Sequence, residues 1–92
     1  MHTGSLEARL LVRGSQSLKD KRQVVRSILD RLRNQFNVSA AEVGARDHRQ
    51  LVILGIAAVG EEARDVRGTL EQVLAALRCH PVAEFLDHEL EA

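Results

Sequence analysis

The residues most able to do chemistry in this sequence are basic side chains between positions 13 and 33. Lys19, Arg22, Arg26 and Arg33 fall within one narrow arc if this segment is a helix, with Asp30 interrupting them. Such a row can neutralise successive phosphates of a nucleic acid and release their bound counterions. The predicted nucleic-acid-binding residues are Arg13, Lys19, Lys21, Arg22, Arg26 and Arg33.

The same basic residues also suit a solvated helix flank that binds no ligand. Arg26 and Asp30 stand four residues apart, a spacing at which they can form an ion pair across one helical turn. Such a pair contributes only about 0.2–0.5 kcal/mol to the stability of a helix. Phosphate binding and a solvated flank are therefore the two interpretations of this row.

The segment that precedes the row could hold an anion. The predicted anion-binding residues are Ser15 and Ser17, beside Lys19 and the free backbone amides of a helix N-terminus. Gly14 is the only glycine here, so the glycine-rich loop that cradles nucleotide phosphates is missing. The alternative is that Ser17 only caps the helix, with Asp20 three residues later completing a capping box.

The spacing of histidines and cysteine does not indicate a metal site. No histidine stands at metal-ligand spacing from another histidine or from Cys79, the single cysteine. Nor does the sequence place a nucleophile beside a base and an orienting group. We therefore expect no metal, no cofactor and no enzymatic activity. The histidines are His2, His48, His80 and His88.

Composition predicts one small domain, residues 1–92, with an ordinary hydrophobic fraction of 45%. The single cysteine allows no intramolecular disulfide, which favours a reducing compartment. The N-terminus lacks the basic and apolar parts of a secretory signal. The longest apolar run, residues 51–59, is too short to cross a bilayer as a helix. We expect a cytoplasmic protein with no membrane partner.

Charge is unevenly distributed although the net charge is zero. Residues 1–60 contain ten Lys and Arg against five Asp and Glu, whereas residues 61–92 contain three against eight. This asymmetry bears on the partners of the protein and not on its fold.

The elements that position the basic row follow from hydrophobic periodicity. Apolar residues alternate with other residues over 6–12, which predicts a half-buried strand. An apolar stripe at helical spacing predicts a helix over 18–35. A weaker pattern over 38–45 predicts a second strand, and a polar turn follows it.

The second half of the chain repeats this arrangement. Residues 51–59 are apolar at both parities, which predicts a strand buried on two sides. A second helix is predicted between Gly60 and Pro81, and residues 85–90 form a last strand. The order βαββαβ predicts an α+β ferredoxin-like fold, with a four-stranded antiparallel sheet and two helices on one face.

The other face of this sheet is expected to be aliphatic and uncovered. A soluble protein rarely leaves so much apolar surface exposed, so we expect a homodimer or another assembly that buries it. The predicted oligomer-interface residues are Leu11, Leu51, Ile53 and Ala57.

The stretch Ser-Gln-Ser-Leu-Lys-Asp-Lys-Arg at residues 15–22 resembles the YlxP-like family of small bacterial proteins. The resemblance continues through the basic helix, residues 36–43, residues 54–57 and residues 87–91, and so covers essentially the whole chain. It implies a ferredoxin-like fold, an unknown function and no catalytic residues. The family's genes commonly lie among those for translation initiation and ribosome maturation.

Two functional hypotheses follow. The first is an RNA- or ribosome-associated accessory factor that binds the phosphate backbone through its basic first helix. The predicted third strand offers no aromatic ring for base stacking, so such a protein would hold RNA by its backbone. The alternative is an oligomeric protein-interaction or regulatory module with no role in nucleic-acid binding.

Overall fold

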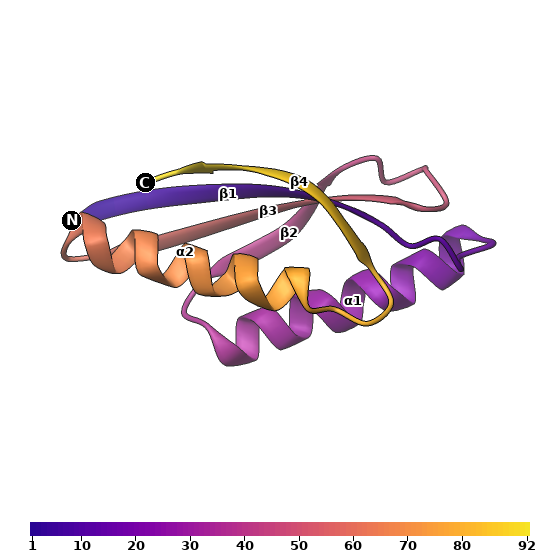
Figure 1. Cartoon of the computed structure of the whole chain (residues 1–92), viewed down its shortest axis with the longest axis horizontal. Coiled ribbons are helices and arrows are strands. Elements are labelled where there is room, and N and C mark those ends of the chain that lie inside the picture. The colour runs from indigo at the N-terminus through magenta and orange to yellow at the C-terminus, as the bar shows by residue number, and fades with distance from the viewer.

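Four strands and two helices alternate along the chain in a computed structural model that describes residues 1–92. The strands form one antiparallel sheet in the order β2-β3-β1-β4, and both helices lie on the same face of it (Figure 1). The predicted α+β ferredoxin-like fold is therefore confirmed. The elements are β1 (His2–Leu11), α1 (Leu18–Gln35), β2 (Ser39–Gly44), β3 (Leu51–Gly60), α2 (Ala63–Arg78) and β4 (Glu84–Glu91).

Helix α1 has the bounds that the sequence predicts because its first turn is capped. The Ser17 hydroxyl accepts a hydrogen bond from the Asp20 amide over 3.1 Å. The Asp20 carboxylate accepts from the Gln16 amide over 3.2 Å, one residue before the position that a capping box uses. The helix therefore begins where a short polar side chain satisfies its free amides.

Helix α2 begins at Ala63 after Glu62, which makes no capping hydrogen bond through its side chain. Gly60, the residue after which the sequence predicts this helix, is the last residue of β3. No helix of the structure combines the length and the apolar character needed to cross a membrane.

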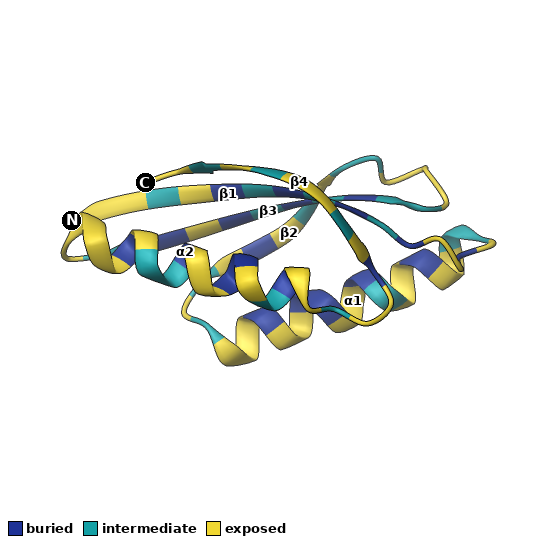
Figure 2. Ribbon diagram, viewed as in Figure 1, coloured by how far each residue is buried: buried dark blue, intermediate teal, exposed yellow.

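The core lies between the helices and one face of the sheet (Figure 2). Alternate residues of β1 and β3 point into it, and the apolar stripes of both helices close it from the other side. The buried residues of the two central strands are Leu6, Ala8, Leu10, Val52, Leu54, Ile56 and Ala58.

The other face of the sheet is uncovered in the single chain, because neither helix lies over it (Figure 1). Residues of β3 at odd positions are partly or fully exposed, so the prediction that this strand is buried on two sides is wrong for the isolated chain. The predicted interface residues share this open face: Leu11 stands opposite Leu51, and Ile53 and Ala57 follow along β3. The homodimer that they would form stays a prediction.

Candidate nucleic-acid interface

Four arginines line one groove between α1 and the edge strand β2. Arg22, Arg26 and Arg33 come from α1, and Arg46 comes from the loop between β2 and β3. The groove encloses about 380 Å³ and opens to solvent at the edge of the sheet. We call it the arginine groove. Its other lining residues are Val25, Leu29, Ala41 and Glu42.

Helical periodicity explains why α1 presents three of these arginines together. Val25, Ile28 and Leu32 of this helix are buried and anchor it to the sheet. Residues 22, 26 and 33 lie one position further along the chain than residues 21, 25 and 32, so their side chains follow the next line on the helix surface. The sequence therefore places this part of the basic row correctly along the flank of the packed face.

Three of the groove arginines have no acidic partner. Arg22, Arg26 and Arg46 take part in none of the ion pairs of the structure. Asp30 instead lies 3.9 Å from Nη1 of Arg33, so the alternative in which Asp30 neutralises Arg26 is wrong. Arg33 also donates a hydrogen bond from Nη2 to the Ala40 carbonyl over 2.6 Å.

Glu42 is the one acidic residue among the groove-lining residues, and a buried lysine neutralises it. Its Oε2 lies 3.1 Å from Nζ of Lys21, and only 11% of the Glu42 side chain is exposed. Oε2 accepts no hydrogen bond, so the pairing is one of charge and not of hydrogen-bond geometry. The groove therefore keeps the positive charge of its arginines.

Lys21 is fully buried, so the prediction that it contacts a nucleic acid is wrong. Its ammonium donates to three backbone carbonyls, those of Ala45 (2.7 Å), Leu51 (3.1 Å) and Arg46 (3.4 Å). A buried lysine is stable only where such partners replace water. One signal was present in the sequence, since Lys21 precedes Val25 by four residues and continues the buried stripe.

Lys21 also determines where Arg46 lies, because it holds the β2–β3 loop from inside. Ala45 is the only residue other than glycine with a positive φ, 55°. This conformation costs free energy, so it persists only where other contacts hold the residue in place. Its carbonyl makes the shortest hydrogen bond to Lys21. Arg46 follows immediately and enters the groove. Sequence reasoning missed Arg46, because only the packing of α1 against β2 brings this loop to the basic row.

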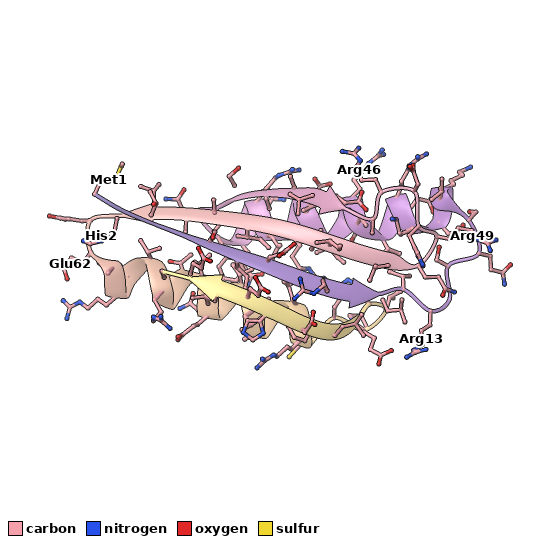
Figure 3. All side chains as sticks on the ribbon, turned by 90° about the horizontal axis from the view of Figure 1, so that it is seen from above. Met1, His2, Arg13, Arg46, Arg49 and Glu62 are labelled. Carbon is pink, nitrogen blue, oxygen red and sulfur yellow. The ribbon has the colours of Figure 1, made fainter.

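The structure does not bring the remaining predicted basic residues into the groove. Arg13 forms an ion pair with Glu84 at 2.5 Å, on the β4 side of the sheet and away from Arg46 (Figure 3). The hydrogen bond from Arg13 lowers the pKa of the Glu84 carboxyl and raises the pKa of Arg13. Lys19 is exposed on the first turn of α1, outside the groove-lining set.

The predicted anion site at the start of α1 also needs correction. Ser15 is buried, and its hydroxyl donates to the Ser17 carbonyl over 2.9 Å. The Ser17 hydroxyl caps the helix, as the alternative interpretation held. Both hydroxyls therefore make hydrogen bonds that serve the local fold, and little of Ser15 is exposed. Nowhere in the chain do three His, Cys, Asp or Glu side chains cluster so that they could hold a metal ion.

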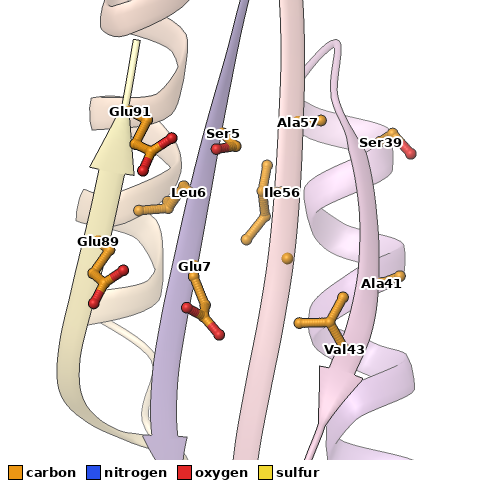
Figure 4. Close-up of a pocket in the computed structure, with 11 residues that line it drawn as sticks. Ser5, Leu6, Glu7, Ser39, Ala41, Val43, Ile56, Ala57, Glu89 and Glu91 are labelled. Atoms are coloured by element: carbon orange, nitrogen blue, oxygen red, sulfur yellow. The ribbon is translucent and has the colours of Figure 1, made fainter.

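The open face of the sheet has a different character from the arginine groove. A shallow concavity of about 370 Å³ runs between β4 and β2, with Glu89 and Glu91 on one side and Ala41 and Val43 on the other (Figure 4). The half of the face formed by β2 and β3 is aliphatic, and the half formed by β1 and β4 is acidic. Such a surface repels phosphates instead of attracting them.

One arginine lies within the acidic half, and carboxylates surround it. Arg9 pairs with Asp87, with Glu7 at 3.4 Å and with Glu89 at 3.9 Å. The hydrogen bond with Asp87, the strongest influence, raises the pKa of Arg9. Three carboxylates against one guanidinium leave this cluster negative.

Two comparisons with known proteins agree with the resemblance seen in the sequence. The family model described as "Protein of unknown function (DUF503)" matches residues 3–90. A relative described as "Uncharacterized protein YlxP", from Bacillus subtilis (strain 168), is 38% identical over 81 residues. The aligned region covers 88% of this chain and 88% of the relative.

Proposed function

We propose that this chain, which belongs to the DUF503 family of proteins of unknown function, binds the phosphate backbone of RNA through the arginine groove. In this role it is an RNA- or ribosome-associated accessory factor. The family's gene neighbourhood among translation genes, which the sequence resemblance implies, supports RNA as the nucleic acid.

One observation carries this proposal. Arg22, Arg26, Arg33 and Arg46 line a single open groove, and the charge of its only carboxylate is taken up by buried Lys21. Guanidinium groups suit phosphate because their donors match two oxygens at once. Arginines scattered over a solvated surface would not converge in this way from a helix and from a loop.

Salt dependence is the property that tests phosphate binding most directly. Each phosphate contact should add about 0.7–0.9 to the slope of log K against log salt concentration. We propose fluorescence anisotropy with a labelled RNA hairpin over a series of potassium chloride concentrations. For the wild-type chain we expect binding that weakens steeply with salt.

The decisive variant replaces two groove arginines and leaves the core intact. Arg22→Gln with Arg26→Gln should reduce the slope by about 1.4–1.8, twice the value for one contact. The matched control is Arg64→Gln with Arg67→Gln, which removes the same charge from exposed positions of α2. Equal losses in both variants, or no wild-type binding near physiological ionic strength, would contradict the proposal.

A second proposal, an oligomeric protein-interaction module, is supported by the open face of the sheet. Val43 and Val59 are 56% and 52% exposed on this face, and Ile53 and Leu51 are partly exposed on it. Aliphatic surface of this kind is more often covered in an assembly than left in water. The two proposals use different surfaces, so each can be tested without disturbing the other.

A further inference from the structure

The aromatic rings of the chain lie away from the arginine groove. Phe36 follows α1 and packs, half-buried, against the core. Phe85 on β4 lies under the Arg78 guanidinium, 5.1 Å from it, with the His88 ring at 5.8 Å. None of these rings is among the groove-lining residues. A base that entered the groove would therefore find no aromatic surface on which to stack.

The open face of the sheet is equally unsuited to bases. In RNA-binding domains with a comparable sheet, aromatic side chains on the central strands stack two or three bases. Here the corresponding concavity presents Ser5, Gly55 and Ala57, with Glu7 and Glu89 beside them. Neither surface offers an aromatic ring on which a base could stack, so the contact that we propose is with sugar and phosphate.

Two parts of the groove are held in place before any ligand binds: the Arg33 side chain and the backbone of Arg46. Arg33 is fixed by its hydrogen bond to Ala40, and Arg46 follows a loop that Lys21 anchors at three carbonyls. A partly preorganised groove favours a rigid ligand, because a flexible strand loses more conformational entropy when it is ordered. A single strand usually compensates for this loss by stacking its bases on aromatic side chains.

Resting on the proposed function, we infer that the arginine groove binds the backbone of double-stranded RNA in preference to single strands. A duplex hides its bases and presents its phosphates and 2′-hydroxyls as rigid rows, which a protein reads by shape. The donors that the groove offers are guanidinium groups, and these match such rows without needing any base contact.

The test measures binding of the full chain, at one salt concentration, to three labelled RNA probes and to one DNA duplex of matching sequence. The RNA probes are a uridine 20-mer, an adenosine 20-mer and the duplex of the two. We expect the duplex to bind about tenfold more tightly than either strand, a difference of about 1.4 kcal/mol. Arg22→Gln with Arg26→Gln should remove most of this preference, whereas Arg64→Gln with Arg67→Gln should preserve it. Circular dichroism confirms that all variants are folded.

Each other outcome separates this inference from the function on which it rests. A single strand that binds as tightly as the duplex, or more tightly, would overturn the duplex preference. If the variant with Arg22→Gln and Arg26→Gln loses that binding, RNA binding through the groove is still supported. Equal binding of a DNA duplex of matching sequence would overturn RNA as the ligand, because the 2′-hydroxyl would then contribute nothing. If the chain binds none of the probes, both the duplex preference and RNA binding itself are overturned.

Discussion

Nζ of Lys21 lies 3.1 Å from Oε2 of Glu42, and this buried pair joins α1 to β2 beside the arginine groove. The same ammonium donates three hydrogen bonds to backbone carbonyls of the β2–β3 loop and the start of β3. A helix, an edge strand and a loop therefore depend on one charged atom that no solvent reaches. The first prediction concerns that atom.

Lys21→Met should destabilise the protein by about 3–5 kcal/mol, the usual effect of removing one partner of a buried ion pair. The change leaves the Glu42 carboxylate without a counter-charge and three carbonyls without a donor. Adding Glu42→Gln should recover only part of the loss, because the carbonyls stay unpaired. Urea unfolding measures all three proteins. Lys19→Met, on the exposed side of the same turn, is the control and should change stability by less than about 0.5 kcal/mol.

Arg46→Gln should weaken RNA binding with little change in stability, because this exposed side chain lines the groove and takes part in no ion pair. One lost phosphate contact should lower the salt slope by about 0.7–0.9. The control is Arg49→Gln in the same loop (Figure 3), since Arg49 lines a polar crevice separate from the groove. If Arg49→Gln reduces the slope as much as Arg46→Gln does, the loop contributes only general charge.

Ile53→Asp should convert the predicted homodimer into a monomer, because it places a carboxylate in the middle of the aliphatic half of the open face. Sedimentation at tens of micromolar, about the range in which a small interface would assemble, measures the change. Val82→Asp is the matched control, because Val82 is 55% exposed but lies in the loop before β4. A wild-type chain that sediments as a monomer would count against the predicted assembly.

The free energy of unfolding should fall as the pH is lowered below about 6.5, in part through His80. Burial lowers the pKa of His80 in the folded protein, and nearby Arg31 lowers it further. The unfolded chain then binds the proton more readily than the folded chain, so stability is retained above the unfolded pKa and lost as the pH falls through the folded pKa. Nδ1 of His80 also accepts hydrogen bonds from the backbone amides of Val82 and Ala83. Protonation of this nitrogen would break both hydrogen bonds.

His80→Asn tests this pH dependence, because its side-chain oxygen can accept the same amides and does not titrate. Urea unfolding at about pH 7.5 and about pH 5.5, on either side of the usual histidine pKa, measures the difference. The variant should lose less stability between these two values than the wild-type protein does. An unchanged difference would show that other groups cause the acid sensitivity.

Much of the fold was already determined by local patterns in the sequence. The bounds of α1 follow from a capping serine at position 17 and an apolar stripe with a period of 3.6 residues. The alternation of Leu6, Ala8 and Leu10 sets which face of β1 is buried. These features depend on residues a few positions apart, so the sequence reveals them without any knowledge of the tertiary structure.

Only part of the candidate site could be predicted from local patterns in the sequence. Arg22, Arg26 and Arg33 share a helix, and their common flank follows from helical geometry. Arg46 reaches them only because β2 packs beside α1 and the loop after it is held from within. Arg13 was predicted to bind nucleic acid together with the row, yet it pairs with Glu84, which is 71 residues away in the chain.

Lys21 shows the physical reason why the sequence predicts the helices and strands but only part of the site. A charged residue is ordinarily solvated, so a sequence pattern assigns it to the surface unless partners for its charge are known. Those partners are Glu42 and the carbonyls of Ala45, Arg46 and Leu51, all more than twenty positions further along the chain. Periodicity along the chain determined the helices and strands, whereas only the tertiary structure decided which charge is buried and which remains free to bind.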